Sequence, residues 1–341
     1  MTVAWDWTPD TLDALAALLR EHGVCDGEVT ARRLGDGHSN LTFLVSDGKR
    51  QVVVRRPPPP PTPPGAHDVL REARLLTALQ GTAVPVPRVL ATAQAGALLD
   101  VPLYVMDLVE GPVVTTSTPA PLDTPAGRRL LGHALVDTLA DLHAVDWRAA
   151  GLADVGRPEG YNARHLARVG RLVADEQGGP PPAFAAVEQW LRDHVPTESG
   201  ATLVHNDYRL GNVVLGPGCV AAVLDWELAT LGDPLCDVGY LLASVPQRGE
   251  PQTPTEELAT AMLEDGWPTR DELAQRYAAR TGRDLSGLDW YRVLALWKLA
   301  VLYEYAHRRA VQGVGDPYYA DAGLVPRFLL AAQVAAGLAP A

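Results

Sequence analysis

The stretch His205-Asn206-Asp207-Tyr208-Arg209-Leu210-Gly211-Asn212 governs how this chain is interpreted, because Asp207 and Asn212 stand in it five positions apart. Apolar residues on either side predict short strands at 202–204 and 213–215. A third strand, expected at 220–224 and paired with them, leads to Asp225. Such a hairpin would bring the oxygens of Asp207, Asn212 and Asp225 together. One Asp-x4-Asn pair alone would be an ordinary polar turn, but the added strand and its aspartate favour a functional site.

These three residues match the spacing of a kinase catalytic loop and the needs of phosphoryl transfer. That reaction requires an acceptor hydroxyl in line with the phosphate and divalent ions that neutralise developing charge. The carboxylate of Asp207 would take the hydroxyl proton. The oxygens of Asn212 and Asp225 would hold Mg²⁺, which prefers a few protein oxygens together with substrate phosphates. We expect His205 to brace the loop rather than to titrate, and Glu227 to be either a metal neighbour or a turn carboxylate.

A second pattern, near the N-terminus, predicts contacts with phosphate groups. Strands expected at 29–34 and 41–45 flank a turn of small and polar residues. Backbone N–H groups in such a turn can approach phosphate oxygens. The residues concerned are Gly35, Gly37, Ser39 and Asn40. Alone the pattern is weak, because many hairpin turns contain two glycines.

Two adjacent cations strengthen this interpretation. A valine-rich strand at 51–56 ends in Arg55 and Arg56. Either guanidinium could pair with nucleotide phosphates and with Glu72 of a helix expected at about 66–79. The plainer alternative is that both arginines are simply exposed at a strand end.

A third pattern, Gly232-Asp233-Pro234-Leu235-Cys236-Asp237, contains two more carboxylates. We interpret Asp233 and Asp237 as turn and helix-cap carboxylates that accept backbone N–H bonds and hold the catalytic loop. Their interpretation as further metal ligands is the less favoured one.

The composition limits the class of protein. The chain has 341 residues, of which 47% are hydrophobic and 21% charged, as in soluble globular proteins. A net charge of -12 argues against a nucleic-acid partner. No apolar run of about 18 residues predicts a membrane span, and the N-terminus does not resemble a signal peptide. Three cysteines far apart (Cys25, Cys219 and Cys236) indicate reduced thiols in a cytoplasmic protein.

The pattern changes from strands to helices near Glu110-Gly111-Pro112, which predicts two domains at 1–109 and 110–341. Thr8-Pro9 is a typical helix start. The proline run at 57–64 is expected to be a stiff connector, with a partner-binding segment as the alternative. Further strands are expected at 84–93 and 98–108, and further helices at 128–143, 184–194, 288–305 and 324–336.

The motifs His205–Asn212, Leu224-Asp225-Trp226-Glu227 and Leu231–Asp237 together resemble the aminoglycoside phosphotransferase family. Within that family they are most similar to the kinase-like domain associated with acyl-CoA dehydrogenases and to its stand-alone bacterial relatives. Residues 34–45, Val54-Arg55-Arg56-Pro57 and residues 139–146 carry the same resemblance, which extends over about 25–310.

The resemblance implies an α+β, bilobal, protein-kinase-like fold with an N-terminal antiparallel sheet lobe and a mainly helical C-terminal lobe. ATP and Mg²⁺ would be the cofactors, and Glu72 would pair with the strand cation. Backbone groups of a hinge would meet adenine at Met106, Asp107 and Leu108. The matching positions for acceptor contacts, a looser correspondence, are Tyr161, Arg164, Tyr208 and Arg209.

This chain departs from protein kinases in two respects. The usual strand lysine is replaced by Arg55 or Arg56, and the two cations are not interchangeable in geometry. No Asp-Phe-Gly or Ala-Pro-Glu motif is present, which argues against a peptide substrate.

We therefore expect an ATP-dependent small-molecule kinase that phosphorylates a hydroxyl group. The resemblance suggests a hydroxyacyl-CoA or a hydroxy acid, and the basic residues Arg164, Arg168 and Arg171 favour an anionic acceptor. One alternative is an aminoglycoside-type antibiotic kinase, which the acidic balance would suit. The other is a pseudokinase that binds nucleotide and a partner without catalysis.

Overall fold

A computed structural model describes residues 7–35, 40–58, 67–176 and 178–338. Contacts within the chain define two units. The first comprises Met1–Glu110 and Ala222–Glu227, and the second comprises Gly111–Ala221 and Leu228–Ala341. The segment 222–227, which contains Asp225, is thus part of the first unit, whereas the sequence placed it in the C-terminal domain.

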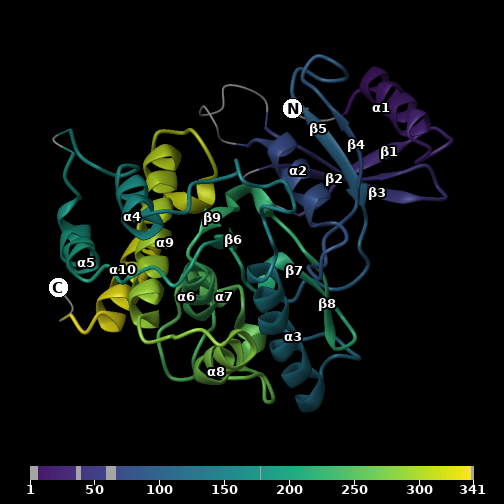
Figure 1. The fold of residues 1–341 in the computed structure, drawn as a ribbon. Coiled ribbons are helices and arrows are strands. Elements are labelled where there is room, and N and C mark those ends of the chain that lie inside the picture. Colours follow the sequence, from purple (N-terminus) through teal and green to yellow (C-terminus); the bar gives the residue numbers. More distant parts are fainter. Residues whose placement is uncertain (1–6, 36–39, 59–66, 177, 339–341) are drawn as a thin grey trace. The chain divides into compact units, whose positions relative to one another are not determined.

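The first unit is built on a five-stranded antiparallel sheet with the strand order β1-β2-β3-β5-β4 (Figure 1). This confirms the predicted antiparallel sheet. In chain order its elements are α1 (Pro9–Glu21), β1 (Thr30–Arg33), β2 (Leu41–Ser46), β3 (Gln51–Arg56), α2 (Val69–Leu79), β4 (Val89–Ala93) and β5 (Leu103–Asp107).

β4 and β5 begin several residues later than the sequence predicted. β4 begins at Val89 instead of residue 84, since Pro85 and Pro87 supply no backbone N–H for a sheet ladder. β5 begins at Leu103, directly after Pro102. Apolar residues precede both strands, so the sequence predicted longer strands than the backbone pairing shows.

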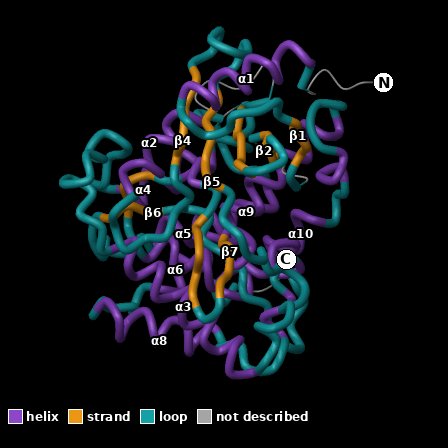
Figure 2. The backbone as a smooth tube through the Cα atoms, turned by 90° about the vertical axis from the view of Figure 1, so that its right-hand side faces the viewer, coloured by secondary structure: helices purple, strands orange, loops and turns teal. Residues whose placement is uncertain are grey.

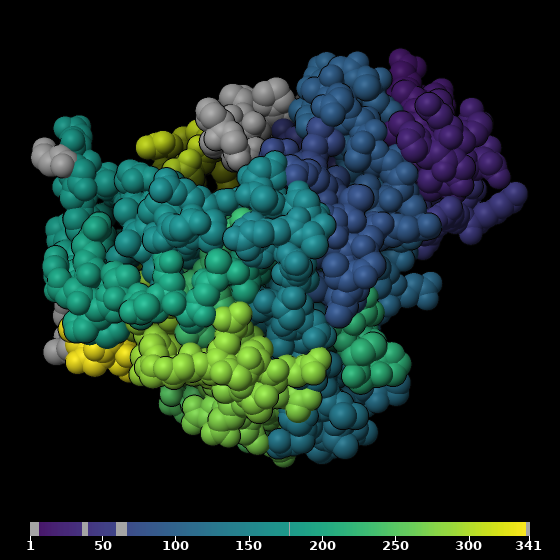
Figure 3. All heavy atoms as spheres, viewed as in Figure 1, coloured from purple at the N-terminus to yellow at the C-terminus, as the bar shows by residue number. Residues whose placement is uncertain are grey.

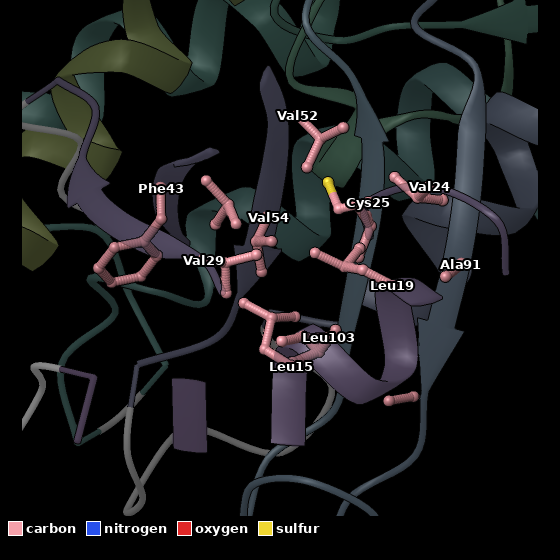
Figure 4. Close-up of a cluster of buried hydrophobic side chains, with 14 of the residues drawn as sticks. Leu15, Leu19, Val24, Cys25, Val29, Phe43, Val52, Val54, Ala91 and Leu103 are labelled. Carbon is pink, nitrogen blue, oxygen red and sulfur yellow. The ribbon is translucent and has the colours of Figure 1, made fainter. Parts of the chain in front are cut away.

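α1 covers one face of the sheet. Thr8 caps the helix as predicted, because its hydroxyl accepts the Thr11 amide at 3.3 Å and its own amide donates to the Thr11 hydroxyl at 2.8 Å. Leu15 and Leu19 are fully buried against strand residues that include Phe43, Val54 and Leu103 (Figure 4).

α2 covers the opposite face. Side chains along a strand alternate between the two faces, so Val54 and Arg56 face α1 while Arg55 faces α2. The helix begins at Val69, where the side chain of the N-cap residue Asp68 accepts the Arg71 amide at 3.0 Å. The predicted start near Ala66, and the proline run from residue 59 onward, lie outside the described residues.

The second unit is mainly helical, with short strands near its centre (Figure 2). This confirms the predicted α+β class. Its helices are α3 (Pro125–His143), α4 (Tyr161–Gly170), α5 (Pro182–Asp193), α6 (Leu235–Ala243), α7 (Pro254–Glu257), α8 (Arg270–Thr281), α9 (Leu288–Val311) and α10 (Leu324–Ala335). Its strands are β6 (Thr202–Val204), β7 (Val213–Gly216), β8 (Cys219–Val223, which continues into the first unit) and β9 (Thr230–Gly232).

The strand pairing differs from the prediction. β7 pairs with β8 as expected, but β6 pairs antiparallel with β9, with Leu203 opposite Leu231. The expected pairing of β6 with the strand at 220–224 is therefore wrong. β9 has only three residues and was hidden in a polar, glycine-containing segment.

Helices α6 and α9 approach each other closely because Gly239 has no side chain. A Cβ atom at residue 239 would lie 2.6 Å from the carbonyl carbon of Tyr291, which is well inside van der Waals contact. Further along α9, Trp297 and Lys298 are both buried.

On the face of the second unit seen in Figure 3, the outer surface comes largely from the teal segment before residue 200 and from the yellow-green region of α8. Among the described residues, no helix is long and apolar enough to cross a membrane.

Candidate active site

Asp207 and Asn212, the first two residues of the predicted site, are in direct contact in the second unit. The loop leaves β6, forms a short 3-10 turn at Leu210–Asn212 and enters β7. The side-chain amide of Asn212 donates to the carboxylate of Asp207 at 2.7 Å and to its backbone carbonyl at 2.8 Å. Because these bonds use Nδ2, the amide oxygen of Asn212 is left to accept or to coordinate.

Asp237 holds the start of this loop, as predicted. Its two carboxylate oxygens accept the backbone amides of His205 and Asn206, each at 2.6 Å. His143 lies 3.2 Å from the same carboxylate. Burial opposes the charge on Asp237, but hydrogen bonds and positive charge from His143, with the His205 amide, outweigh it and lower the pKa of Asp237.

His205 has the geometry of a brace. Its side chain is fully buried, and its ring Nδ1 accepts the backbone amide of Asp207 at 3.2 Å. The His205 ring thus supports the backbone of Asp207.

Asp233 accepts a backbone N–H bond at the start of α6, as predicted for a helix-cap carboxylate, but its other backbone contact is at Ser199 rather than in the 205–212 loop. Its carboxylate accepts the backbone amides of Ser199 at 2.8 Å and Leu235 at 3.0 Å, and the hydroxyl of Tyr291 at 2.7 Å. It therefore anchors residues near 199 and the first turn of α6, while Asp237 alone of the two contacts the catalytic loop.

Asp225 lies in the first unit beside the strand cation. The guanidinium of Arg55 pairs with Glu72 at 3.0 Å, with Asp225, and with Glu227 at 3.8 Å. Glu72 also accepts the backbone amide of Trp226 at 3.2 Å, which attaches this segment to α2. The four charged side chains carry a net charge of -2 when all are ionised.

Burial shapes the electrostatics of this cluster. The side chains of Arg55 and Glu72 are only 11% and 1% exposed. Burial raises the pKa of Glu72 to about 7; Arg55 opposes this change, and Asp225 and Glu227 add to it. The three carboxylates together keep Arg55 charged.

The structure distinguishes Arg55 from Arg56. The Arg56 guanidinium lies on the α1 face of the sheet, 5.4 Å from the ring centroid of Trp7 and 5.1 Å from that of Phe43. Arg56 is 6% exposed, so it is not the surface residue of the plainer alternative. Only Arg55 lies on the face that carries Glu72 and Asp225.

Part of the predicted glycine turn can be placed. Gly35 has φ +66°, a conformation that favours glycine. Asn40 is buried, and its amide donates to Glu227 at 3.0 Å, which ties the end of the turn to the Arg55 cluster. Gly37 and Ser39 lie outside the described residues.

The predicted hinge residues lie at the end of β5 and directly after it. Met106 and Asp107 are the last residues of β5, and the Asp107 amide already donates to the Arg88 carbonyl at 2.9 Å. The Asp107 carboxylate pairs with Arg50 and Arg88. Met106 pairs with Val53 and Val89 in the same sheet, so Met106, Asp107 and Leu108 all remain predicted hinge residues.

Two predicted acceptor residues are buried. The Tyr208 side chain is fully buried and its hydroxyl donates to the Leu135 carbonyl at 2.7 Å. Tyr161 is 5% exposed and donates to Asn206 Oδ1 at 2.9 Å. Neither ring lies where an acceptor could reach it, so both are structural supports of the loop.

The other two acceptor candidates, Arg164 and Arg209, are accessible. Arg164 is exposed on α4. Arg209 Nε lies 3.6 Å from the carboxylate of Asp207, and the two side chains are 22% and 20% exposed.

Lys298 was not among the site residues predicted from the sequence. This residue on α9 donates from Nζ to the backbone carbonyl of Asn206 at 2.6 Å. The one available signal was a charged residue within the apolar run at 288–305, since a buried cation requires a partner.

Comparisons with known proteins agree with this arrangement. A sequence model described as the phosphotransferase enzyme family matches residues 30–294. Acyl-CoA dehydrogenase family member 10 of Mus musculus is 30% identical over 309 residues, which are 88% of this chain and 28% of that protein. The chain spans less than two fifths of the length of the first curated relatives it matches.

Solved structures match over nearly the whole chain. A putative aminoglycoside phosphotransferase from Ralstonia eutropha is 30% identical with a TM-score of 0.77, and the match covers 95% of this chain and 97% of that one. A thermostable mutant of aminoglycoside phosphotransferase APH(4)-Ia, in a ternary complex with AMP-PNP and hygromycin B, is 17% identical with a TM-score of 0.61. That match covers 96% of this chain and 99% of that one. Together they confirm the predicted kinase-like fold class.

Proposed function

Since the chain belongs to the phosphotransferase enzyme family, we propose that it transfers the γ-phosphoryl group of ATP to a hydroxyl group of a small molecule. The observation that carries this proposal is the contact between Asp207 and Asn212 on a loop anchored by Asp237. A carboxylate held in place at a loop surface is suited to accept a proton from a bound hydroxyl.

In this proposal Asp207 is the catalytic base. Its carboxylate orients the acceptor hydroxyl and takes its proton as the oxygen attacks the phosphorus. The amide of Asn212 limits the rotation of this carboxylate, because it bonds both the side chain and the backbone of Asp207. Fixing a reactive group in this way lowers the entropic part of the barrier.

Asn212 and Asp225 are the proposed Mg²⁺ ligands. The donor set fits this ion, since an amide oxygen and a carboxylate are hard oxygen ligands. The excess negative charge of the Arg55, Glu72, Asp225 and Glu227 cluster also favours a divalent cation. When bound, Mg²⁺ would neutralise charge that develops on the transferring phosphate.

Arg55 is the proposed contact to the nucleotide phosphates. It occupies the α2 face and pairs with Glu72, as the strand cation of a kinase-like fold is expected to do. A guanidinium offers planar, bidentate hydrogen bonding to phosphate oxygens. The glycine turn and the backbone at Met106, Asp107 and Leu108 are proposed to complete nucleotide binding.

We propose an anionic acceptor, namely a hydroxy acid or a hydroxyacyl-CoA. The supporting observation is that Arg209 places a cation next to the carboxylate of the candidate base. A polycationic antibiotic would be repelled by this guanidinium, which argues against an aminoglycoside despite the net charge of -12.

A panel of acceptors tests this proposal. The purified protein is incubated with Mg-ATP and, separately, with short-chain hydroxy acids, hydroxyacyl-CoAs and aminoglycosides, and phosphorylated products are detected by ³¹P NMR. We expect product with one of the acidic acceptors and a lower kcat/KM for that acceptor in Arg209→Gln. Transfer to aminoglycosides alone would refute the acceptor class, and transfer to nothing in the panel would favour the pseudokinase.

A further inference from the structure

We propose that Lys298 is a positioning residue that fixes the peptide group between Asn206 and Asp207 and so orients the candidate base. This inference rests on the proposed phosphotransfer function for its consequence in catalysis. The structural part concerns the second unit only and can be tested separately.

Lys298 is buried at the centre of the second unit. It is 6% exposed, and its ammonium group lies 4.8 Å from the ring centroid of Tyr240. Of the 29 cationic residues in the sequence, Lys49 and Lys298 are the two lysines. A compact ammonium suits a site with one carbonyl and one ring face, whereas a planar guanidinium requires a wider set of acceptors.

Both ends of the peptide group between Asn206 and Asp207 are held. Lys298 Nζ donates to the Asn206 carbonyl at 2.6 Å, and the Asp207 amide donates to His205 Nδ1 at 3.2 Å. A peptide group is planar, so these two bonds fix the plane from which the Cα–Cβ bond of Asp207 departs. Small rotations of this plane would displace the carboxylate.

The backbone at Asn206 needs such support. Its φ of +65° is uncommon for a residue other than glycine, and the surrounding structure must maintain it. The Asn206 amide donates to Asp237 at 2.6 Å, and its side chain bonds Tyr161 at 2.9 Å and the Leu228 carbonyl at 3.1 Å. In the described part of the chain, Lys298 is the donor that restrains the remaining group, the carbonyl.

The charges around Lys298 are consistent with a retained ammonium. Burial lowers the pKa of Lys298, while the carboxylates of Asp207 and Asp237 act in the opposite direction. The Asp207 carboxylate thus helps to keep Lys298 charged, and Lys298 in turn orients the backbone of Asp207.

Lys298→Met tests the proposal, since methionine has a similar length but no donor. Arg270→Met is the matched control, because Arg270 is also a buried cation of the second unit that donates to a backbone carbonyl, that of Val245 at 2.8 Å. Amide hydrogen exchange is measured by mass spectrometry on peptides that cover 205–212. Turnover of ATP with water as acceptor and binding of a fluorescent Mg-ATP analogue are measured in parallel.

We expect Lys298→Met to speed exchange in the loop at least tenfold and to lower kcat at least tenfold, with the nucleotide Kd changed less than twofold. Arg270→Met should lower stability in urea but leave loop exchange and kcat within twofold of the unmodified protein. If the methionine variant does not fold, Lys298→Gln, whose shorter side chain lacks the ammonium, should give the same direction of change.

Two results would overturn the inference: unchanged loop exchange in the folded variant, or equal changes in both variants. If the unmodified protein turns over no ATP, the proposed function fails, but the exchange comparison still decides whether Lys298 fixes the loop.

Discussion

Replacing Arg55 with methionine should measure how much the buried charge cluster of the first unit contributes to the free energy of unfolding. The change removes the cation but keeps much of the apolar side chain. It leaves Glu72, which is 1% exposed, beside Asp225 and Glu227 without the guanidinium that pairs with all three carboxylates. Removing one partner of a buried ion pair typically costs about 3–5 kcal/mol, because the other charge remains desolvated and unpaired.

The expected loss of stability is judged against a control substitution in the same unit, at Arg50 in the turn between β2 and β3. Arg50 pairs with Asp107 at 3.1 Å, but these side chains are 39% and 33% exposed. Solvent screens such a pair, so Arg50→Met should cost about 0–1 kcal/mol. We expect the two substitutions to differ by at least about 2 kcal/mol in the free energy of unfolding.

The assay is urea unfolding without nucleotide, followed by circular dichroism at pH 8 and pH 6. Loss of Arg55 removes the charge that lowers the pKa of Glu72, so Glu72 takes up a proton more readily and the cost should be smaller at pH 6. In a double-mutant cycle, Glu72→Gln should recover part of the loss. Equal losses for Arg55→Met and Arg50→Met, or a cost independent of pH and of Glu72, would refute this reasoning.

Three further predictions concern Glu72, Gly239 and Asp225. Because burial raises the pKa of Glu72 from 4.5 to about 7, its contribution to stability is fully present below pH 4.5 and is lost as the pH rises toward 7. Urea unfolding between pH 4.5 and 8 should thus show a shallower decline for Glu72→Gln, and an unaltered decline would contradict the prediction. Gly239→Ala should destabilise the second unit by about 1–3 kcal/mol in thermal unfolding, since the added Cβ would lie 2.6 Å from Tyr291. Gly287→Ala, whose nearest contact would be 3.4 Å, is its control and should have a much smaller effect. Asp225→Asn should abolish the Mg²⁺ dependence of ATP binding in calorimetry, and binding that still requires Mg²⁺ would exclude the proposed ligand.

Local pattern predicted much of the secondary structure. The valine-rich strand at 51–56 and the short strand at 202–204 have the predicted bounds, because alternation and apolar runs are encoded within the segments themselves. The pairing of β6 with β9 was missed since it joins three-residue strands whose paired residues are far apart in sequence, for example Val204 and Thr230, which are 26 positions apart. Pairing of this kind depends on long-range packing rather than on a local signal.

The candidate site was predictable in its residue types and less so in its contacts. Arg55 and Arg56 are equivalent in sequence, and only the positions of α1 and α2 on opposite faces distinguish them. Tyr208 directly follows Asp207 in the candidate catalytic loop, yet its ring points into the core toward Leu135. Lys298 could not be connected to Asp207 from sequence, because its partner is a backbone carbonyl 92 positions away.

The most direct test of the central claim is single-turnover transfer from Mg-ATP with Asp207→Asn. This side chain keeps the shape of aspartate and can remain beside Asn212, but it cannot take a proton. With an acceptor found in the panel, we predict product formation at least a hundredfold slower than in the unmodified protein, with the nucleotide Kd within twofold. Transfer at an unchanged rate would contradict the assignment of Asp207 as the base.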